Sequence, residues 1–265
     1  MGIVLILLSF LLTKIILNPV SKLLLNNGAV RENYLGKKIP IGLGLVIWLG
    51  TTPYLLIYGI INSEKNIFFI LLILTTTLLV GFIDDLLGNH KVKGLKGHFL
   101  MFIRDKELTS GVLKALLISL FSLLFSYQIS QNILLLIINF IILILTTNSF
   151  NLLDVRPGRT LKVFIFASIL LSIFYPASRL FLSIIIASII AYVPVDFKGK
   201  GMLGDTGSNF LGMSMGIVLI SNLSNIVKIM VMIFLVYLHI FTEKQSLTAL
   251  IDKVYFLRLI DNFGR

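Results

Sequence analysis

Nine long apolar segments, separated by short polar ones, make up most of this 265-residue chain. Each is close to the roughly 20 apolar residues that an α-helix needs to cross a lipid bilayer. The pattern therefore predicts an all-α polytopic membrane protein with about nine transmembrane helices. The expected spans cover residues 2–24, 40–61, 66–84, 112–128, 132–149, 161–176, 178–195, 207–223 and 225–242.

The last stretch, residues 243–265, has a different pattern. Its charged residues lie between apolar residues that recur at helical spacing, namely Leu247, Leu250, Ile251, Val254, Leu257 and Ile260. This spacing is typical of an amphipathic helix that lies on the membrane surface or packs on neighbouring loops, so we do not expect a tenth span. The chain thus divides into a single transmembrane domain, 1–242, and an amphipathic tail, 243–265.

The composition excludes a soluble domain. Hydrophobic residues make up 57% of the chain and charged residues only 13%, whereas a soluble domain has about 25% charged residues. The net charge of +11 indicates Lys and Arg in the cytoplasmic loops of a membrane protein, and we expect the bilayer rather than nucleic acid as a partner. There is no Cys, which excludes disulfides and thiolate chemistry.

The charges also predict an orientation. When segment 25–39 is placed in the cytoplasm, the cytoplasmic side holds all 23 Lys and Arg residues except Lys14, Lys65, Arg179 and Lys228. We therefore expect the N-terminus outside and the C-terminus in the cytoplasm. All but one of the 12 Asp and Glu residues fall on the cytoplasmic side too. Because acidic residues contribute little to orientation, their clustering suggests function or cation binding.

Two adjacent carboxylates, Asp84 and Asp85, end the third apolar segment in the sequence GFIDD. Acidic residues at a helix C-terminus oppose the helix dipole, although a solvated helix end would accommodate them. Neighbouring residues on a helix point about 100° apart. One of the pair could therefore bind a metal or accept a proton while the other holds a partner.

The sequence NSFNLLD places Asn148, Asn151 and Asp154 at intervals of three. If the helix continues, they share one broad face, and their oxygens suit Mg²⁺ or sugar hydroxyl groups. The structural alternative is that they cap a helix end and begin a turn.

The sequence GDTGSNFLG, which begins at Gly204, precedes the eighth apolar segment. Its small residues allow backbone N–H groups to approach a phosphate at a helix N-terminus, and Asp205 would suit a metal ion beside that phosphate. An ordinary helix N-cap explains the same residues. Upstream, Asp196 stands near Lys198 and Lys200, which either contact a diphosphate or serve as topological charges.

In this order, GFIDD, NSFNLLD and GDTGSNFLG resemble the polyprenyl-phosphate N-acetylhexosamine-1-phosphate transferase superfamily, the phospho-N-acetylmuramoyl-pentapeptide transferase-like members of glycosyltransferase family 4. The resemblance covers about residues 30–225. It implies an enzyme in which a polyprenyl phosphate, such as undecaprenyl phosphate, attacks the β-phosphate of a UDP-linked sugar with Mg²⁺ or Mn²⁺. The products would be a polyprenyl-diphospho-sugar for cell-envelope glycans and UMP.

The resemblance also implies roles for individual residues. Asp84, Asp85 and Asp205 match catalytic positions, and Asp205, Asn151 and Asp154 match positions that hold the metal. Substrate binding is expected from Asn148, Asn151, Asp154, Lys91, Lys93, Lys96, Arg156, Arg159, Gly207 and Ser208. The expected location is the cytoplasmic membrane, with the transmembrane domain catalytic, the active site facing the cytoplasm and a homodimer as a further expectation.

The C-terminal region departs from the family pattern. It reads LHIFTEKQSLTALIDKVYFLRLIDNFGR, without the paired histidines of the family's His-rich loop. The alternative function is therefore a non-catalytic relative that binds polyprenyl phosphate or nucleotide-sugar as a regulator or assembly partner. An ion-coupled transporter is disfavoured, because the acidic residues cluster at loops rather than at the middle of the helices.

Overall fold

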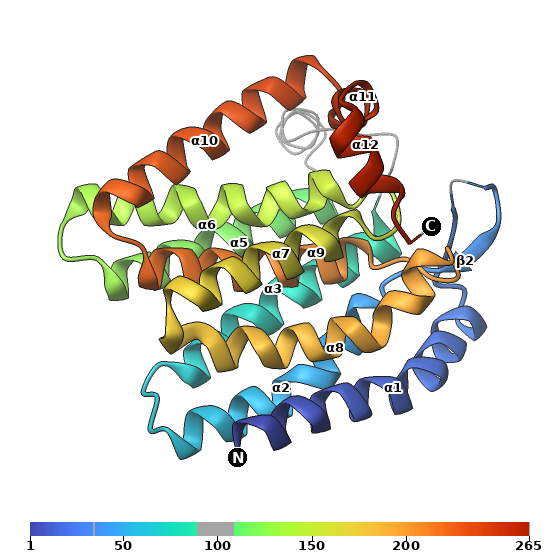
Figure 1. The fold of residues 1–265 in the computed structure, drawn as a ribbon, viewed down its shortest axis with the longest axis horizontal. Helices are drawn as coiled ribbons and strands as arrows, with labels where there is room; N and C mark the ends of the chain where they lie inside the picture. Colours follow the sequence, from blue (N-terminus) through green and yellow to red (C-terminus); the bar gives the residue numbers. More distant parts are fainter. Residues whose placement is uncertain (34, 89–108, 265) are drawn as a thin grey trace.

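The computed structural model describes residues 1–33, 35–88 and 109–264, most of which lie in long helices that run side by side (Figure 1). Each expected apolar segment corresponds to one of these helices. Their bounds are α1 (Gly2–Asn26), α2 (Gly44–Ile61), α3 (Ile67–Leu87), α5 (Ser110–Ile129), α6 (Ile133–Leu153), α7 (Arg159–Phe174), α8 (Arg179–Phe197), α9 (Gly204–Asn222) and α10 (Asn225–Lys244), with a 3₁₀ turn at Pro176–Ser178.

Within the described residues, seven helices are long and apolar enough to cross a bilayer, which makes the chain a multi-pass membrane protein. The helices that fall short are α7, which has only 16 residues, and α9, which is rich in Gly, Ser and other small or polar residues. Most of α9 is buried between α3 and α6. Because protein rather than lipid surrounds it, α9 can carry polar side chains at this depth.

Small residues allow the backbone of α9 to lie in direct contact with the backbones of α2 and α3. A Cβ on Gly44 of α2 would lie 2.1 Å from the Cα of Gly207, and a Cβ on Gly81 of α3 would lie 2.3 Å from the carbonyl oxygen of Asp205. Such contacts are typical of helix packing in membranes, where close van der Waals packing replaces the hydrophobic effect. They hold the first turn of α9 against the start of α2 and against the C-terminal half of α3.

A short β-hairpin interrupts the connection between α1 and α2, where the sequence predicts only a loop. Strands β1 (Val30–Glu32) and β2 (Lys38–Pro40) pair antiparallel, with Arg31 opposite Ile39. The Asn33 side-chain oxygen accepts hydrogen bonds from two backbone N–H groups of the turn, at 2.9 and 3.0 Å. Its amide group donates to the carbonyl of Gly199 at 3.0 Å, which docks the hairpin beside α8 and α9. We call this end of the bundle the hairpin end.

The tail forms two short helices, α11 (Leu247–Lys253) and α12 (Tyr255–Asn262), which meet at Val254. Both lie near the C-terminus at the hairpin end of the bundle (Figure 1). The last long helix, α10, runs along one edge and packs against α6, with few of its residues buried. The expected amphipathic helix is therefore present but divided in two.

We expect Gly44→Ala to destabilise the protein, because its methyl group would overlap the backbone of Gly207. Overpacking of this kind costs about 1–3 kcal/mol, and a lower thermal unfolding midpoint in detergent would report it. Gly216→Ala is the matched control, since the nearest atom to its Cβ would be in the Leu143 side chain, at 3.1 Å, and backbone would come no closer than 3.4 Å. Equal midpoints for the two variants would contradict the close packing of α2 on α9.

Candidate functional site

Four carboxylates from four separate elements line one cavity of about 100 Å³ at the hairpin end. They belong to Asp85 at the end of α3, Asp154 after α6, Asp196 near the end of α8, and Asp205 in the first turn of α9. The helices alternate in direction, which brings these distant parts of the sequence together. Two guanidinium-bearing residues, Arg31 and Arg156, also line the cavity.

Asp85 is committed to the first turn of α9. One carboxylate oxygen accepts a hydrogen bond from the backbone N–H of Asp205 at 3.0 Å. The other accepts from the backbone N–H and the hydroxyl of Thr206, at 3.0 and 2.6 Å. A negative charge at the start of a helix also interacts favourably with the helix dipole. Asp85 therefore caps the N-terminus of α9 from a neighbouring helix, and it fixes the position of Asp205 in the first turn of α9.

Asp84 points to a different set of partners. One of its carboxylate oxygens accepts from the Ser110 hydroxyl at 2.6 Å, and the other pairs with the Lys114 ammonium at 2.6 Å. The same ammonium group also pairs with Asp205. Lys114 thus joins the two acidic motifs at the ends of α3 and α9. Asp84, Lys114 and Asp205 all remain partly accessible to solvent.

Lys114 is not among the expected site residues, because its place in the sequence predicts only a cytoplasmic positive charge. Its position within an apolar segment is the feature of the sequence that could have identified it. It lies one turn inside the apolar helix α5, near Ser110 at the N-terminus. A charged side chain within a membrane helix is costly and generally pairs with another charge. Arg31 was likewise expected only as a topological charge, and it lines the cavity.

The second motif contributes through Asn151 and Asp154. The Asn151 side-chain oxygen accepts a hydrogen bond from the Ser208 hydroxyl, which ties the end of α6 to the start of α9. Asp154 lines the cavity and accepts a hydrogen bond from the Thr160 hydroxyl at 3.3 Å. Asn148 is exposed, and neither Asn148 nor Asn151 is among the residues that line the cavity.

Asp196 is buried, and its carboxylate accepts hydrogen bonds from the Gly158 N–H at 2.5 Å and from the Tyr192 hydroxyl at 3.3 Å. It therefore links the end of α8 to the turn that precedes α7. Lys198 and Lys200 follow it in sequence but do not line the cavity.

The remaining expected residues have different surroundings. Gly207 packs against Gly44 at the crossing of α2 and α9. Arg156 lines the cavity, whereas Arg159 is buried and paired with Asp261 of the tail. Lys91, Lys93 and Lys96 lie outside the described residues, so their expected substrate contacts stay predictions.

The carboxylate oxygens that line the cavity are of the type that hard divalent cations such as Mg²⁺ or Mn²⁺ prefer. Burial raises the pKa of the Asp154 carboxyl well above its ordinary value, and the charges of Asp196, Asp205 and Asp85 raise it further. A bound cation would relieve this crowding of negative charge. In the part of the chain that the structure describes, no group of three or more His, Cys, Asp or Glu residues is arranged to hold a metal ion by itself. Mg²⁺ sites of this kind are usually completed by water and substrate phosphates.

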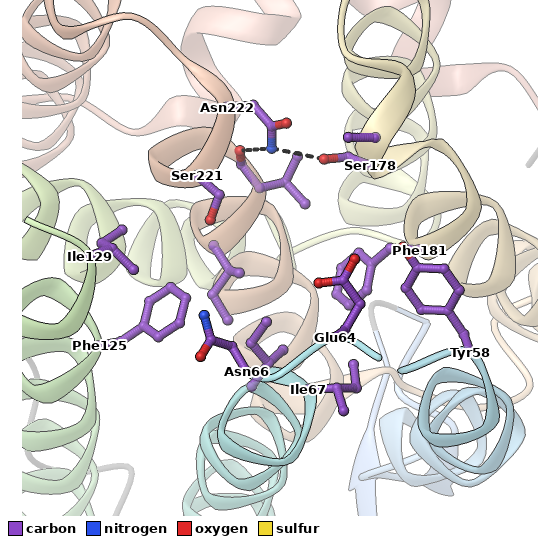
Figure 2. Close-up of a pocket in the computed structure, with 14 residues that line it drawn as sticks. Tyr58, Glu64, Asn66, Ile67, Phe125, Ile129, Ser178, Phe181, Ser221 and Asn222 are labelled. Carbon is purple, nitrogen blue, oxygen red and sulfur yellow. Dashed lines mark hydrogen bonds between the residues drawn. The ribbon is translucent and has the colours of Figure 1, made fainter. Parts of the chain in front are cut away.

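A second cavity, of about 270 Å³, lies toward the opposite end of the bundle. Figure 2 shows apolar and aromatic side chains around it, with the carboxylate of Glu64 and the amide of Asn66 at its side. Asn222 donates a hydrogen bond to the Ser178 hydroxyl at 2.8 Å there. Its lining includes a single carboxylate and no Lys or Arg. The smaller, charged cavity is therefore the better candidate for chemistry on phosphates.

The sequence model of glycosyl transferase family 4 matches residues 67–223, which is more than half of the chain. The chain belongs to glycosyl transferase family 4. This matched region runs from α3 to α9, so it contains Lys114 and all four carboxylates of the cavity. Membership supports a transferase that acts on a lipid-linked substrate and, in general terms, a polyprenyl-phosphate sugar-1-phosphate transferase role. A comparison with curated proteins found no match.

The two adjacent aspartates of this family 4 protein should respond differently to mutation. Asp85→Ala removes three hydrogen bonds at the start of α9, and we expect a loss of about 2 kcal/mol, as for a strong helix cap. Hydrogen exchange of the α9 first-turn amides should accelerate, and the thermal midpoint should fall. Asp84→Ala is the control, because the Asp84 carboxylate interacts with the side chains of Ser110, Lys114 and Asp205 rather than with the backbone N–H groups of the α9 first turn. Faster exchange in both variants alike would contradict the capping role.

Proposed function

We propose that the protein transfers an N-acetylhexosamine-1-phosphate from a UDP-sugar to a polyprenyl phosphate such as undecaprenyl phosphate. The reaction releases UMP and serves cell-envelope glycan or polymer synthesis on the cytoplasmic face of the membrane. One observation supports this most. A family 4 chain brings Asp84, Lys114 and Asp205 into direct contact at the edge of a cavity lined by further carboxylates. Acidic oxygens and a cation are what a reaction between two phosphates requires.

In this reaction an oxygen of the lipid phosphate attacks the β-phosphorus of the UDP-sugar, and the bond to UMP breaks. Asp84 and Lys114 are the proposed contacts of the lipid phosphate. The ammonium group of Lys114 attracts the phosphate, and Asp84 orients it or accepts its proton. Both groups lie at helix ends at the hairpin end of the bundle, where the phosphate of a lipid anchored in the bilayer would arrive. Developing charge is stabilised by groups that are already in place.

The other polar residues arrange the donor side. Asp85 holds the first turn of α9, and the Asn151–Ser208 hydrogen bond holds the end of α6 against it. Mg²⁺ held by Asp205, Asn151 and Asp154 would supply charge screening between the two phosphates. Arg156 and Arg31 line the same cavity and are the proposed contacts of the nucleotide diphosphate, for which guanidinium groups are well suited.

The test is an assay in detergent with undecaprenyl phosphate and a panel of radiolabelled UDP-N-acetylhexosamines. We expect a lipid-linked product from the unmodified protein and a loss of roughly 10²–10³-fold in kcat for Lys114→Met and for Asp205→Asn, as for removal of one key electrostatic group. Lys228→Met is the matched control. Lys228 is a buried lysine in the first turn of α10, far from the hairpin end.

Two results would contradict the proposal. A protein that binds UMP but yields no product with any UDP-sugar would favour the non-catalytic alternative, a binding partner of nucleotide-sugar or lipid phosphate. Unchanged turnover in Lys114→Met would exclude the proposed role of the contact between Asp84, Lys114 and Asp205.

A further inference from the structure

A buried ion pair joins the tail to the start of α7. The Arg159 guanidinium donates to both carboxylate oxygens of Asp261, at 2.8 and 2.9 Å. The side chains are only 4% and 2% exposed. Two residues that lie 102 positions apart in the sequence thus form one of the least accessible charge pairs of the described structure. A pair of this kind is costly to break, because the remaining charge stays buried without a partner.

Further contacts hold the tail in the same place. Arg159 donates to the Thr248 hydroxyl at 3.0 Å, which ties α11 to α7. The Lys162 ammonium donates to the backbone carbonyls of Ile260 and Asp261, at 2.9 and 2.8 Å. These carbonyls belong to the last turn of α12, where free carbonyl groups and the helix dipole favour a positive charge. One basic segment at the start of α7 therefore receives both tail helices.

This docking reaches the wall of the charged cavity. Arg156, which lines the cavity, contacts Asp252 of α11 at 3.4 Å and Asp261 of α12 at 3.8 Å. On the other side, the ring of Phe197 is held between Gly158 and Gly264, since a Cβ on either glycine would lie within about 2.5 Å of it. Phe197 directly follows Asp196. The tail thus touches both the Arg156 turn and the residue beside Asp196.

We propose that Asp261 is a positioning residue that, through its ion pair with Arg159, straps the tail across the α6–α7 turn and keeps Arg156 at the cavity for nucleotide binding. The identity of the nucleotide in this inference rests on the proposed function. The docking of the tail rests on the contacts above alone. Arg159 then binds the tail instead of the substrate. Asp261 touches no substrate and acts only by holding the turn.

The ion pair can be tested with a single variant that breaks it and a double variant that removes both charges. Asp261→Asn leaves a buried guanidinium unpaired, which should release the tail. The double variant Arg159→Met/Asp261→Leu replaces both charges by apolar side chains of similar volume, a change that buried pairs often tolerate. If the role of Asp261 is docking, the double variant should restore what the single variant loses. Glu243→Gln, at an exposed acid before the tail helices, is the control.

Three measurements on the full-length protein in detergent distinguish the possibilities. Trypsin cleavage at the exposed Lys253 and Arg258 reports release of the tail, because local unfolding must precede cleavage. Calorimetric titration with UMP, the product common to all UDP-sugars, reports the nucleotide site without turnover. In the transferase assay we follow KM for the UDP-sugar separately from kcat.

For Asp261→Asn we expect at least tenfold faster cleavage, about tenfold weaker UMP binding, and a KM increase of similar size with kcat changed by less than about threefold. The double variant should return all three to within about threefold of the unmodified protein. Faster cleavage with unchanged UMP affinity would overturn the positioning role, and unchanged cleavage would overturn the strap. An unmodified protein that binds no UMP would contradict the proposed function instead, while the cleavage rates would still decide whether the ion pair docks the tail.

Discussion

The contact between the Asp85 carboxylate and the first turn of α9 is the interaction on which the geometry of the site depends. It joins the C-terminal end of one buried helix to the N-terminal end of another and uses every oxygen of the carboxylate. Gly81 and Gly44 permit the close approach that this contact needs. This contact also sets the position of Asp205, because the backbone N–H of Asp205 donates one of the hydrogen bonds that the Asp85 carboxylate accepts.

The number of carboxylates at the cavity explains why a positively charged side chain lies beside it. Four carboxylates meet in a small space within a membrane protein, where uncompensated charge is expensive. Lys114 compensates part of it by pairing with Asp84 and Asp205. Burial and the neighbouring carboxylates raise the pKa of Asp154, and Arg31 and Arg156 line the same cavity. This excess of carboxylates is what makes the cavity a candidate for the proposed chemistry on phosphates.

The tail departs from the expected family pattern in sequence, and it lies at the edge of the charged cavity. It lacks paired histidines, yet its acidic residues meet Arg156 and Arg159 at the edge of the charged cavity. A segment outside the region matched by the family thus contacts a residue inside it that lines the site. Strong, buried contacts at this place are a reason for treating the tail as part of the site rather than as a free extension.

The sequence by itself determined the membrane class, the positions of the long helices and the convergence of the GFIDD, NSFNLLD and GDTGSNFLG motifs at one end. These follow from local properties, since apolar length specifies a helix and alternation of helices brings every second loop together. Only the tertiary structure decided that Asp85 caps α9, that Lys114 lies between Asp84 and Asp205, and that Arg159 pairs with Asp261. Those contacts depend on the rotation of each helix about its axis and on pairings across more than 25 residues. Such pairings are set by packing between helices, which no local pattern of hydrophobic and polar positions encodes.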